Sequence, residues 1–235
     1  MNYWAVVPAA GVGRRMGTEI PKQYLALEGR PVIDWTLEVL LASPRIQGVV
    51  VAVGAEDPFW GDTEHAGHPR VAVVPGGKER ADSVLNALRH LETRAGGDDF
   101  VLVHDAARPC LRSDDLERLM DEASDEQGGL LAMPVRDTMK QADDQGRSER
   151  TLDRGRMWHA YTPQLFPLGS LRRALEGALA AGVVVTDEAS AMEWAGHRPK
   201  LVEGHPDNLK ITRPGDLELA AFHLINRRAE EGSSL

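Results

Sequence analysis

The sequence predicts an α/β fold with an open, mostly parallel, doubly wound sheet and a projecting β-hairpin arm. Short apolar runs alternate with longer amphipathic segments along most of the chain, and a glycine-rich loop follows the first apolar run directly. One polar stretch, residues 136–154, interrupts this alternation. Such alternation is typical of right-handed βαβ crossovers, which build a parallel sheet with helices on both faces. Because 235 residues can bury a sizeable core, we expect one domain, 1–235, with 136–154 as an excursion from it.

The first half of the chain carries four predicted strands and two predicted helices. Residues 49–53 are apolar and β-branched in succession, which is typical of a strand covered on both faces. Residues 31–43 repeat apolar side chains at spacings of four, seven and eight from Ile33, which predicts an amphipathic helix. In chain order the elements are a strand at 4–8, a helix at 31–43, strands at 49–53 and 71–74, a helix at 79–94 and a strand at 100–103.

The second half continues the pattern on both sides of the polar stretch. Ser113 is expected to cap a helix at 114–123, and the last helix is expected to begin just after Pro214. In chain order the elements are a helix at 114–123, a strand at 129–133, a helix marked by Leu171, Leu175, Ala178 and Leu179, a helix at 187–194, a strand at 200–203 and a helix marked by Leu217, Ala221, Leu224 and Ile225.

Residues 136–154 are polar, carry turn-forming residues at 143–146 and have no apolar stripe. Their flanks can pair as a hairpin that projects from the body. A mobile surface loop is equally compatible with these local signals.

Composition and charge exclude several classes of protein. Lys and Arg total 27 and Asp and Glu total 36, so the net charge is −9, which argues against a binder of duplex nucleic acid. The single cysteine, Cys110, excludes an internal disulfide and a four-cysteine zinc site. Since no apolar run reaches the roughly 20 residues that cross a bilayer, and the N-terminus lacks the order of a secretory signal, we expect a cytoplasmic protein without a membrane partner.

The loop after the first strand, residues 8–17, has the small residues that let backbone N–H groups approach a phosphate. Gly11 and Gly13 begin a dinucleotide-binding pattern, but Met16 stands where its third glycine belongs, which disfavours an NAD-dependent oxidoreductase. The loop is also cationic, because Arg14 and Arg15 lie inside it and Lys22 follows shortly after. Two adjacent arginines are often a solvated surface pair, but beside a loop at a strand end we favour anion binding.

Several motifs in this order resemble 2-C-methyl-D-erythritol 4-phosphate cytidylyltransferases of the non-mevalonate isoprenoid pathway. The similarity covers nearly the whole chain and implies a Rossmann-like, nucleotidyltransferase-type fold. The matching segments are 8–17, 21–25, 76–84, 103–109, 137–138, 153–154, 158–164, 186–190, 202–204 and 208–214.

The resemblance implies that a phosphate oxygen of methylerythritol phosphate attacks the α-phosphorus of CTP and releases pyrophosphate. It implies that Arg15 and Lys22 flank the α-phosphate, that Lys210 acts on the acceptor side, and that Mg²⁺ arrives with CTP. Both cations beside the α-phosphate remain charged at neutral pH and suit phosphoryl oxygens. No residue set is expected to form a dedicated metal site, and we interpret the eight histidines as structural.

The family's binding residues map onto three sets in this chain. The nucleotide set comprises Ala9, Ala10, Gly11, Gly13, Gly77 and Ser83, with the cytosine read by backbone groups and by the Ser83 hydroxyl. The acceptor set comprises Asp105 near hydroxyls, Arg108 near phosphate, and Thr162 and Thr138, which shape the site. Thr138 and Arg154 are implied to reach the site of a partner subunit, which makes the arm the dimerisation element of a homodimer. Lys78 departs from the family, some of whose members have an acidic residue there, and this puts the ribose contact in doubt.

Two alternatives stay open at this stage. A related cytidylyltransferase could act on another polyol phosphate, such as ribitol 5-phosphate, since the acceptors are chemically similar. A protein of another class, a non-catalytic nucleotide-binding module, would lack Arg15 or Lys22, and both are present.

Overall fold

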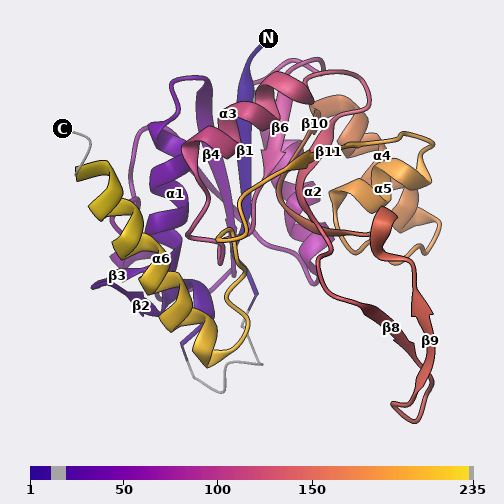
Figure 1. Ribbon diagram of the computed structural model, residues 1–235. Coiled ribbons are helices and arrows are strands. Elements are labelled where there is room, and N and C mark those ends of the chain that lie inside the picture. Colours follow the sequence, from indigo (N-terminus) through magenta and orange to yellow (C-terminus); the bar gives the residue numbers. More distant parts are fainter. Residues whose placement is uncertain (12–19, 233–235) are drawn as a thin grey trace.

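The computed structural model describes residues 1–11 and 20–232, with side chains described as far as residue 229 (Figure 1). Their main feature is a seven-stranded sheet in the order β11-β7-β10-β6-β1-β4-β5. Its strands are β1 (Tyr3–Pro8), β4 (Ile46–Val53), β5 (Val71–Pro75), β6 (Phe100–Val103), β7 (Gly129–Pro134), β10 (Trp158–Pro167) and β11 (Lys200–Glu203). Only β10 runs antiparallel to its neighbours within this sheet, so the predicted open, mostly parallel sheet is confirmed.

Helices cover both faces of the sheet, as expected of a doubly wound fold. One face packs against α1 (Val32–Ala42) and α3 (Ser113–Glu122). The other packs against α2 (Arg80–Leu91), α4 (Leu168–Ala180) and α5 (Glu188–Trp194). The last helix, α6 (Pro214–Gly232), packs through Leu224 against the Trp35 side of α1 in a third, smaller apolar cluster that includes Cys110. None of the helices in the described part of the chain could span a membrane.

The structure corrects two local predictions. Ser113 is the first residue of α3 rather than its cap, because Arg112 holds the cap position and no side chain caps that end. The helix α6 begins at Pro214 itself, where the missing N–H of proline costs no hydrogen bond.

The strand β10 was not predicted, although it lies inside the sheet. Pro163 lies within it and Pro167 ends it, and prolines usually argue against a central strand because they cannot donate to the ladder. The register with β7 shifts between Ala160 and Gln164, which accommodates this irregularity. A short antiparallel pair, β2 (Ala26–Leu27) and β3 (Arg30–Pro31), was also not predicted.

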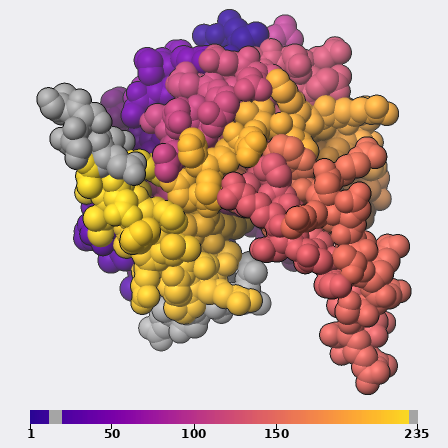
Figure 2. Space-filling model, viewed as in Figure 1, coloured from indigo at the N-terminus to yellow at the C-terminus, as the bar shows by residue number. Residues whose placement is uncertain are grey.

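Residues 136–154, which we call the arm, form a hairpin rather than an unpaired loop. The strands β8 (Met139–Ala142) and β9 (Ser148–Leu152) pair antiparallel. Asp143 organises their turn by accepting the backbone N–H groups of Gln145 and Arg147 at 2.9 and 2.8 Å. No residue of the arm is buried, and the arm projects away from the rest of the surface (Figures 1 and 2).

Candidate active site

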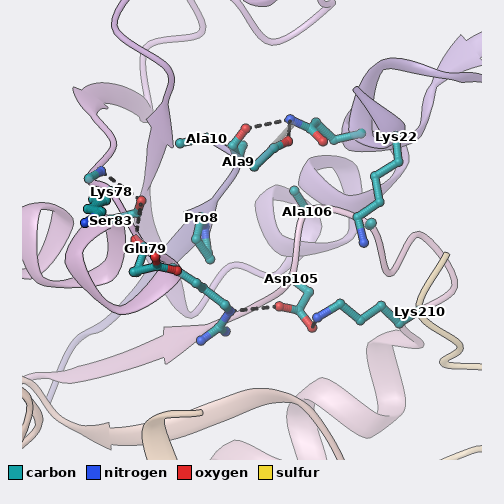
Figure 3. Close-up of a pocket in the computed structure, with 15 residues that line it drawn as sticks. Pro8, Ala9, Ala10, Lys22, Lys78, Glu79, Ser83, Asp105, Ala106 and Lys210 are labelled. Carbon is teal, nitrogen blue, oxygen red and sulfur yellow. Dashed lines mark hydrogen bonds and ion pairs between the residues drawn. The ribbon is translucent and has the colours of Figure 1, made fainter. Parts of the chain in front are cut away.

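A cavity of about 270 Å³ lies where β1, β5 and β6 end (Figure 3). We call it the first pocket. In parallel sheets, ligands bind at the carboxyl ends of the strands, and the loops that leave these three strands supply most of the lining. Its lining residues are Pro8, Ala9, Ala10, Gly11, Lys22, Gln23, Gly77, Lys78, Glu79, Arg80, Ser83, Asp105, Ala106, Ala107 and Lys210.

The described part of the first loop is fixed from two sides. The Ala9 N–H donates to the Ala52 carbonyl at the end of β4, at 2.7 Å. From the other side the buried Gln23 amide donates to the Ala9 and Gly11 carbonyls, at 2.6 and 3.1 Å. These bonds occupy both backbone groups of Ala9, so the start of the loop, at Ala9 to Gly11, is held in place by the protein itself.

Glycines 76 and 77 bring the loop after β5 close to its neighbours. A Cβ at Gly76 would lie 2.3 Å from the Ala10 Cβ, and one at Gly77 would lie 2.2 Å from the Asp82 Cβ. Both distances are too short for any side chain, so this close approach requires glycine. The Ser83 hydroxyl accepts the Gly77 N–H at 2.9 Å and donates to the Glu79 carbonyl at 3.2 Å, which fastens this loop to the start of α2.

Asp105 lies at the centre of a cluster of cations in the pocket wall. Its carboxylate pairs with Lys210 at 3.0 Å and with Arg80 and Arg108 at 3.2 Å each (Figure 3 draws the first two). Burial alone would raise the pKa of this carboxyl, but the three positive charges outweigh burial and hold that pKa far below its usual range. Asp105 is therefore ionised at every physiological pH and binds the three cations together.

Two lysines enter the first pocket from opposite segments. Lys22, in a short 3₁₀ helix at Lys22–Tyr24, donates from its ammonium to the Ile211 carbonyl at 2.9 Å. Lys210, the neighbour of Ile211, pairs with Asp105. The Ile211 N–H donates to the Ala107 carbonyl at 2.9 Å, so the Lys210 segment is tied to the loop that carries Asp105.

A second cavity, of about 300 Å³, adjoins the first, and we call it the second pocket. Arg80, Asp105 and Lys210 line both pockets and form the wall between them. The other residues of the second pocket are Arg108, Ala160, Tyr161, Thr162, Gln164, Thr186 and Asp187. Arg108 is buried, donates to the Asn208 carbonyl at 2.7 Å and stacks over the Tyr161 ring.

Thr162 belongs to a hydrogen-bond chain behind this wall. Its hydroxyl oxygen accepts the Asp105 N–H at 3.1 Å and lies 2.9 Å from His104 Nδ1. His104 Nε2 lies 3.1 Å from the Arg108 carbonyl, which can only accept, so Nε2 carries the proton and Nδ1 accepts from Thr162. Burial lowers the pKa of His104 to about 4, which keeps the ring neutral. The interpretation of His104 as structural agrees with this arrangement.

The carboxylates of the two pockets do not offer a free set of metal ligands among the described residues. Asp105 is taken by three cations, Glu79 caps α2 and Asp187 caps α5. A separate group, Asp114, Asp115 and His205, could hold an ion by geometry but lines neither pocket. Asp115 in that group is already paired with Arg118. The carboxylates of the two pockets are therefore already engaged by partners within the described part of the chain.

The structure brings together most of the residues expected from the sequence. Ala9, Ala10, Gly11, Gly77, Ser83, Lys22, Lys210 and Asp105 line the first pocket, and Arg108 and Thr162 line the second. Gly13 and Arg15 lie outside the described residues. Thr138 and Arg154 are exposed on the arm and line neither pocket of their own chain.

Sequence reasoning gave no role to Gln23, Arg80 or Glu188, although all three lie in the matched motifs. Gln23 holds the first loop, and Arg80 lies between the pockets. Glu188 is fully buried and pairs with Arg80. For Gln23 and Arg80 a partial signal was available, because each is a polar residue beside a loop that already carried an assignment.

Comparison with known proteins agrees with this geometry. The family model described as IspD, 2-C-methyl-D-erythritol 4-phosphate cytidylyltransferase, matches residues 3–226. A relative of that name from Pseudomonas putida is 55% identical over 218 residues, which are 92% of this chain and 93% of the relative. Another from Pseudomonas aeruginosa is 58% identical over 217 residues, with the same two shares. A crystal structure of the Francisella tularensis protein of that name is similar with a TM-score of 0.83 and 38% identity, and the match covers 95% of this chain and 100% of that one.

Proposed function

This chain belongs to the 2-C-methyl-D-erythritol 4-phosphate cytidylyltransferase family and transfers a cytidylyl group from CTP to 2-C-methyl-D-erythritol 4-phosphate, and from that premise we propose how its two pockets divide the reaction. The first pocket binds CTP, and the second binds the acceptor. The observation that carries this assignment is the shared wall, since Arg80, Asp105 and Lys210 line both cavities. Two phosphorylated reactants then meet at a wall with more positive than negative charge.

In this proposal the fixed loops hold the nucleotide. The cytosine and ribose lie along Ala10, Gly77 and Ser83, where the absence of side chains at the glycines lets the ligand approach the backbone. The triphosphate lies toward Lys22 and Lys210. Because the protein as a whole has a net charge of −9, binding of an anion depends on this local concentration of cations.

The chemical step needs no covalent nucleophile on the protein. An oxygen of the acceptor phosphate forms a bond with the α-phosphorus of CTP, while the bond from that phosphorus to the oxygen bridging to the β-phosphate breaks. Pyrophosphate leaves with the electron pair of the broken bond, and the product is 4-diphosphocytidyl-2-C-methyl-D-erythritol. A phosphate monoester is mostly ionised at neutral pH, so no general base is required.

Lys22 and Arg15 are proposed to neutralise charge that develops on the α-phosphoryl oxygens in the transition state. Lys210 and Arg108 are proposed to hold the acceptor phosphate in line with the scissile bond. Lys22 and Lys210 would hold the triphosphate of a CTP complex with Mg²⁺, in which the ion would supply charge neutralisation. The proposed setting is the cytoplasm, where CTP is available.

We also propose that the chain forms one domain and acts as a homodimer whose arm completes the partner's acceptor site. The arm has no core of its own, and Thr138 and Arg154 are exposed on it, with Arg154 donating to the Arg136 carbonyl within the arm. A second copy would cover these residues and place Arg154 near a substrate phosphate. Such a partner also explains why the chain keeps a long polar hairpin.

Subunit mixing tests the shared site. Lys22→Ala and Arg154→Ala are each expected to be nearly inactive alone, but dissociated and reassociated mixtures regain activity. Random pairing makes half of the dimers mixed, and each mixed dimer has one intact site of two, so about a quarter of wild-type activity is expected. If mixtures that form mixed dimers do not regain activity, the proposal that the two subunits share each active site is wrong.

The substrate assignment is tested by pyrophosphate release with CTP, UTP and ATP, and with methylerythritol phosphate and ribitol 5-phosphate as acceptors. CTP with methylerythritol phosphate is expected to give the fastest turnover, because the relatives of this chain carry that activity in their names. Equal rates with the three nucleotides would remove the cytosine assignment. Faster turnover with ribitol 5-phosphate would remove the acceptor assignment.

A further inference from the structure

The start of α5 contributes a buried carboxylate that has no part in the mechanism above. Glu188 is fully buried, and its side chain lines neither pocket. Its two oxygens accept from Arg80 Nη1 and Nη2 at 2.6 and 3.1 Å, so the pair is bidentate. Bidentate pairs between arginine and a carboxylate fix the orientation of the guanidinium as well as its position.

The helix that carries Glu188 is itself held firmly. Asp187 caps α5 by accepting the Ser190 N–H at 2.9 Å. Gln164 of β10 donates to the Asp187 carboxylate at 2.9 Å and accepts the Ala189 N–H at 2.7 Å. The bonds on both sides of Glu188 therefore leave its carboxylate little freedom to follow Arg80 if Arg80 moves.

Arg80 connects this buried anchor to the reactive wall. With both terminal nitrogens on Glu188, its Nε donates to Asp105 Oδ1 at 3.2 Å. The other oxygen, Oδ2, is left for Lys210 at 3.0 Å and Arg108 at 3.2 Å. The orientation of Arg80 thus decides which cations share Asp105.

The balance of charges in this cluster also indicates that Glu188 affects which cations pair with Asp105. Arg80, Arg108 and Lys210 contribute three positive charges, and Asp105 and Glu188 contribute two negative ones, so the cluster carries +1. Without the charge of Glu188, Asp105 would be the one carboxylate of this cluster. The guanidinium of Arg80 would then pair with Asp105 through its terminal nitrogens and compete with Lys210 for that carboxylate.

We propose that Glu188 is a positioning residue for cytidylyl transfer. It orients Arg80, and through Arg80 it keeps Asp105 available to Lys210 at the boundary between the nucleotide and acceptor pockets. It touches neither substrate. The inference rests on the proposed division of the reaction between the two pockets.

A double-mutant cycle on the purified full chain tests this role. Glu188→Gln keeps the shape of the side chain and removes its charge. It is expected to lower kcat about ten- to one-hundred-fold, with the KM for CTP changed by less than about twofold, because misplacement of a reacting group affects turnover more than nucleotide binding. If Glu188 acts only through Arg80, the double variant Arg80→Gln/Glu188→Gln has the same kcat as Arg80→Gln alone.

Glu117→Gln is the control for loss of an arginine-paired carboxylate outside the pockets, although the Glu117 side chain is 38% exposed. Glu117 also accepts from an arginine and a second donor, Arg45 at 3.0 Å and Ser43 at 2.7 Å, but it lines neither pocket. Its kcat is expected to match the wild type. A comparable loss in this control would show that removal of any such carboxylate lowers activity, and would contradict the proposed role.

Several results would overturn the inference. The first is an unchanged kcat in Glu188→Gln. The second is a rise in the KM for CTP that accounts for the whole loss of kcat/KM in that variant. The third is a double variant whose fold-loss in kcat equals the product of the fold-losses in the two single variants. If Arg80→Gln does not fold, because it leaves the Glu188 charge buried and unpaired, the kcat and KM of Glu188→Gln decide by themselves. A wild-type chain without turnover on CTP and the acceptor would instead remove the proposed function, so the two failures are distinguishable.

Discussion

Replacing Asp105 by asparagine should destabilise the protein more than any exchange of a surface carboxylate. The side chain is 9% exposed and meets three cations at 3.0 to 3.2 Å. Removing one partner of a buried ion pair costs about 3–5 kcal/mol. Because the asparagine carbonyl still accepts one hydrogen bond, we take the lower end, about 3 kcal/mol.

That loss converts to a measurable shift in melting temperature. For chains of 150–250 residues, each 1 kcal/mol lowers Tm by about 2–4 °C, so Asp105→Asn should lower Tm by about 6–12 °C. Asp121→Asn is the matched control, since Asp121 also pairs with an arginine, Arg45, but its side chain is 67% exposed. An exposed pair contributes about 0–1 kcal/mol, so its Tm should fall by less than about 4 °C.

Thermal unfolding followed by circular dichroism measures both shifts. Kinetics add a second readout, because the substitution raises the net charge of the wall by one. The KM for CTP should not rise, whereas kcat should fall as Lys210 loses its partner. Equal Tm shifts for Asp105→Asn and Asp121→Asn would refute the cluster as a stabilising feature.

Three further predictions follow from the same geometry. Gly76→Ala should lower Tm and weaken CTP binding, because its Cβ would lie 2.3 Å from the Ala10 Cβ. Gly96→Ala should do neither, because its Cβ would meet nothing within 4 Å. Equal melting temperatures of the two variants would contradict the close approach at Gly76. Lys22→Ala should fold and lose about 2–4 kcal/mol of transition-state stabilisation in steady-state pyrophosphate release, and wild-type turnover would remove its proposed role. Burial lowers the pKa of His104 from 6.5 to about 4, so unfolding takes up a proton in that window and stability should fall as pH falls from about 6.5 toward 4. Urea unfolding at several pH values measures this slope, which should shrink in His104→Gln; an unchanged slope would contradict it.

The parts of the fold that the sequence predicted well are those whose signal is local. Residues 100–103 are a strand with the predicted bounds, because four apolar residues in succession fit a buried strand better than any alternative. The helix predicted at 31–43 is α1 at Val32–Ala42, since its apolar stripe is continuous. The strand β10 lacked such a signal, because its prolines and its exposed first residues conceal its central position.

The candidate site divides in the same way. Small residues and cations after the first strand pointed to Ala10 and Lys22, the family resemblance pointed to Gly77, and all three line the first pocket. The buried pairing of Glu188 with Arg80 could not be predicted, because a glutamate at a helix start is usually solvated. Only the three-dimensional packing of α5 against β10 and α2 places that carboxylate on Arg80, more than one hundred residues away in the chain.

The two-pocket account is tested most directly by a crystal structure of the protein with methylerythritol phosphate and a CTP analogue. In this analogue a methylene group replaces the oxygen between the α- and β-phosphorus atoms. We expect the cytosine beside Gly77 and Ser83, the α-phosphate beside Lys22, and the acceptor phosphate in the second pocket on the side of the α-phosphorus opposite the methylene group. Both reactants in one cavity, or an acceptor phosphate on the same side as the methylene group, would contradict the account.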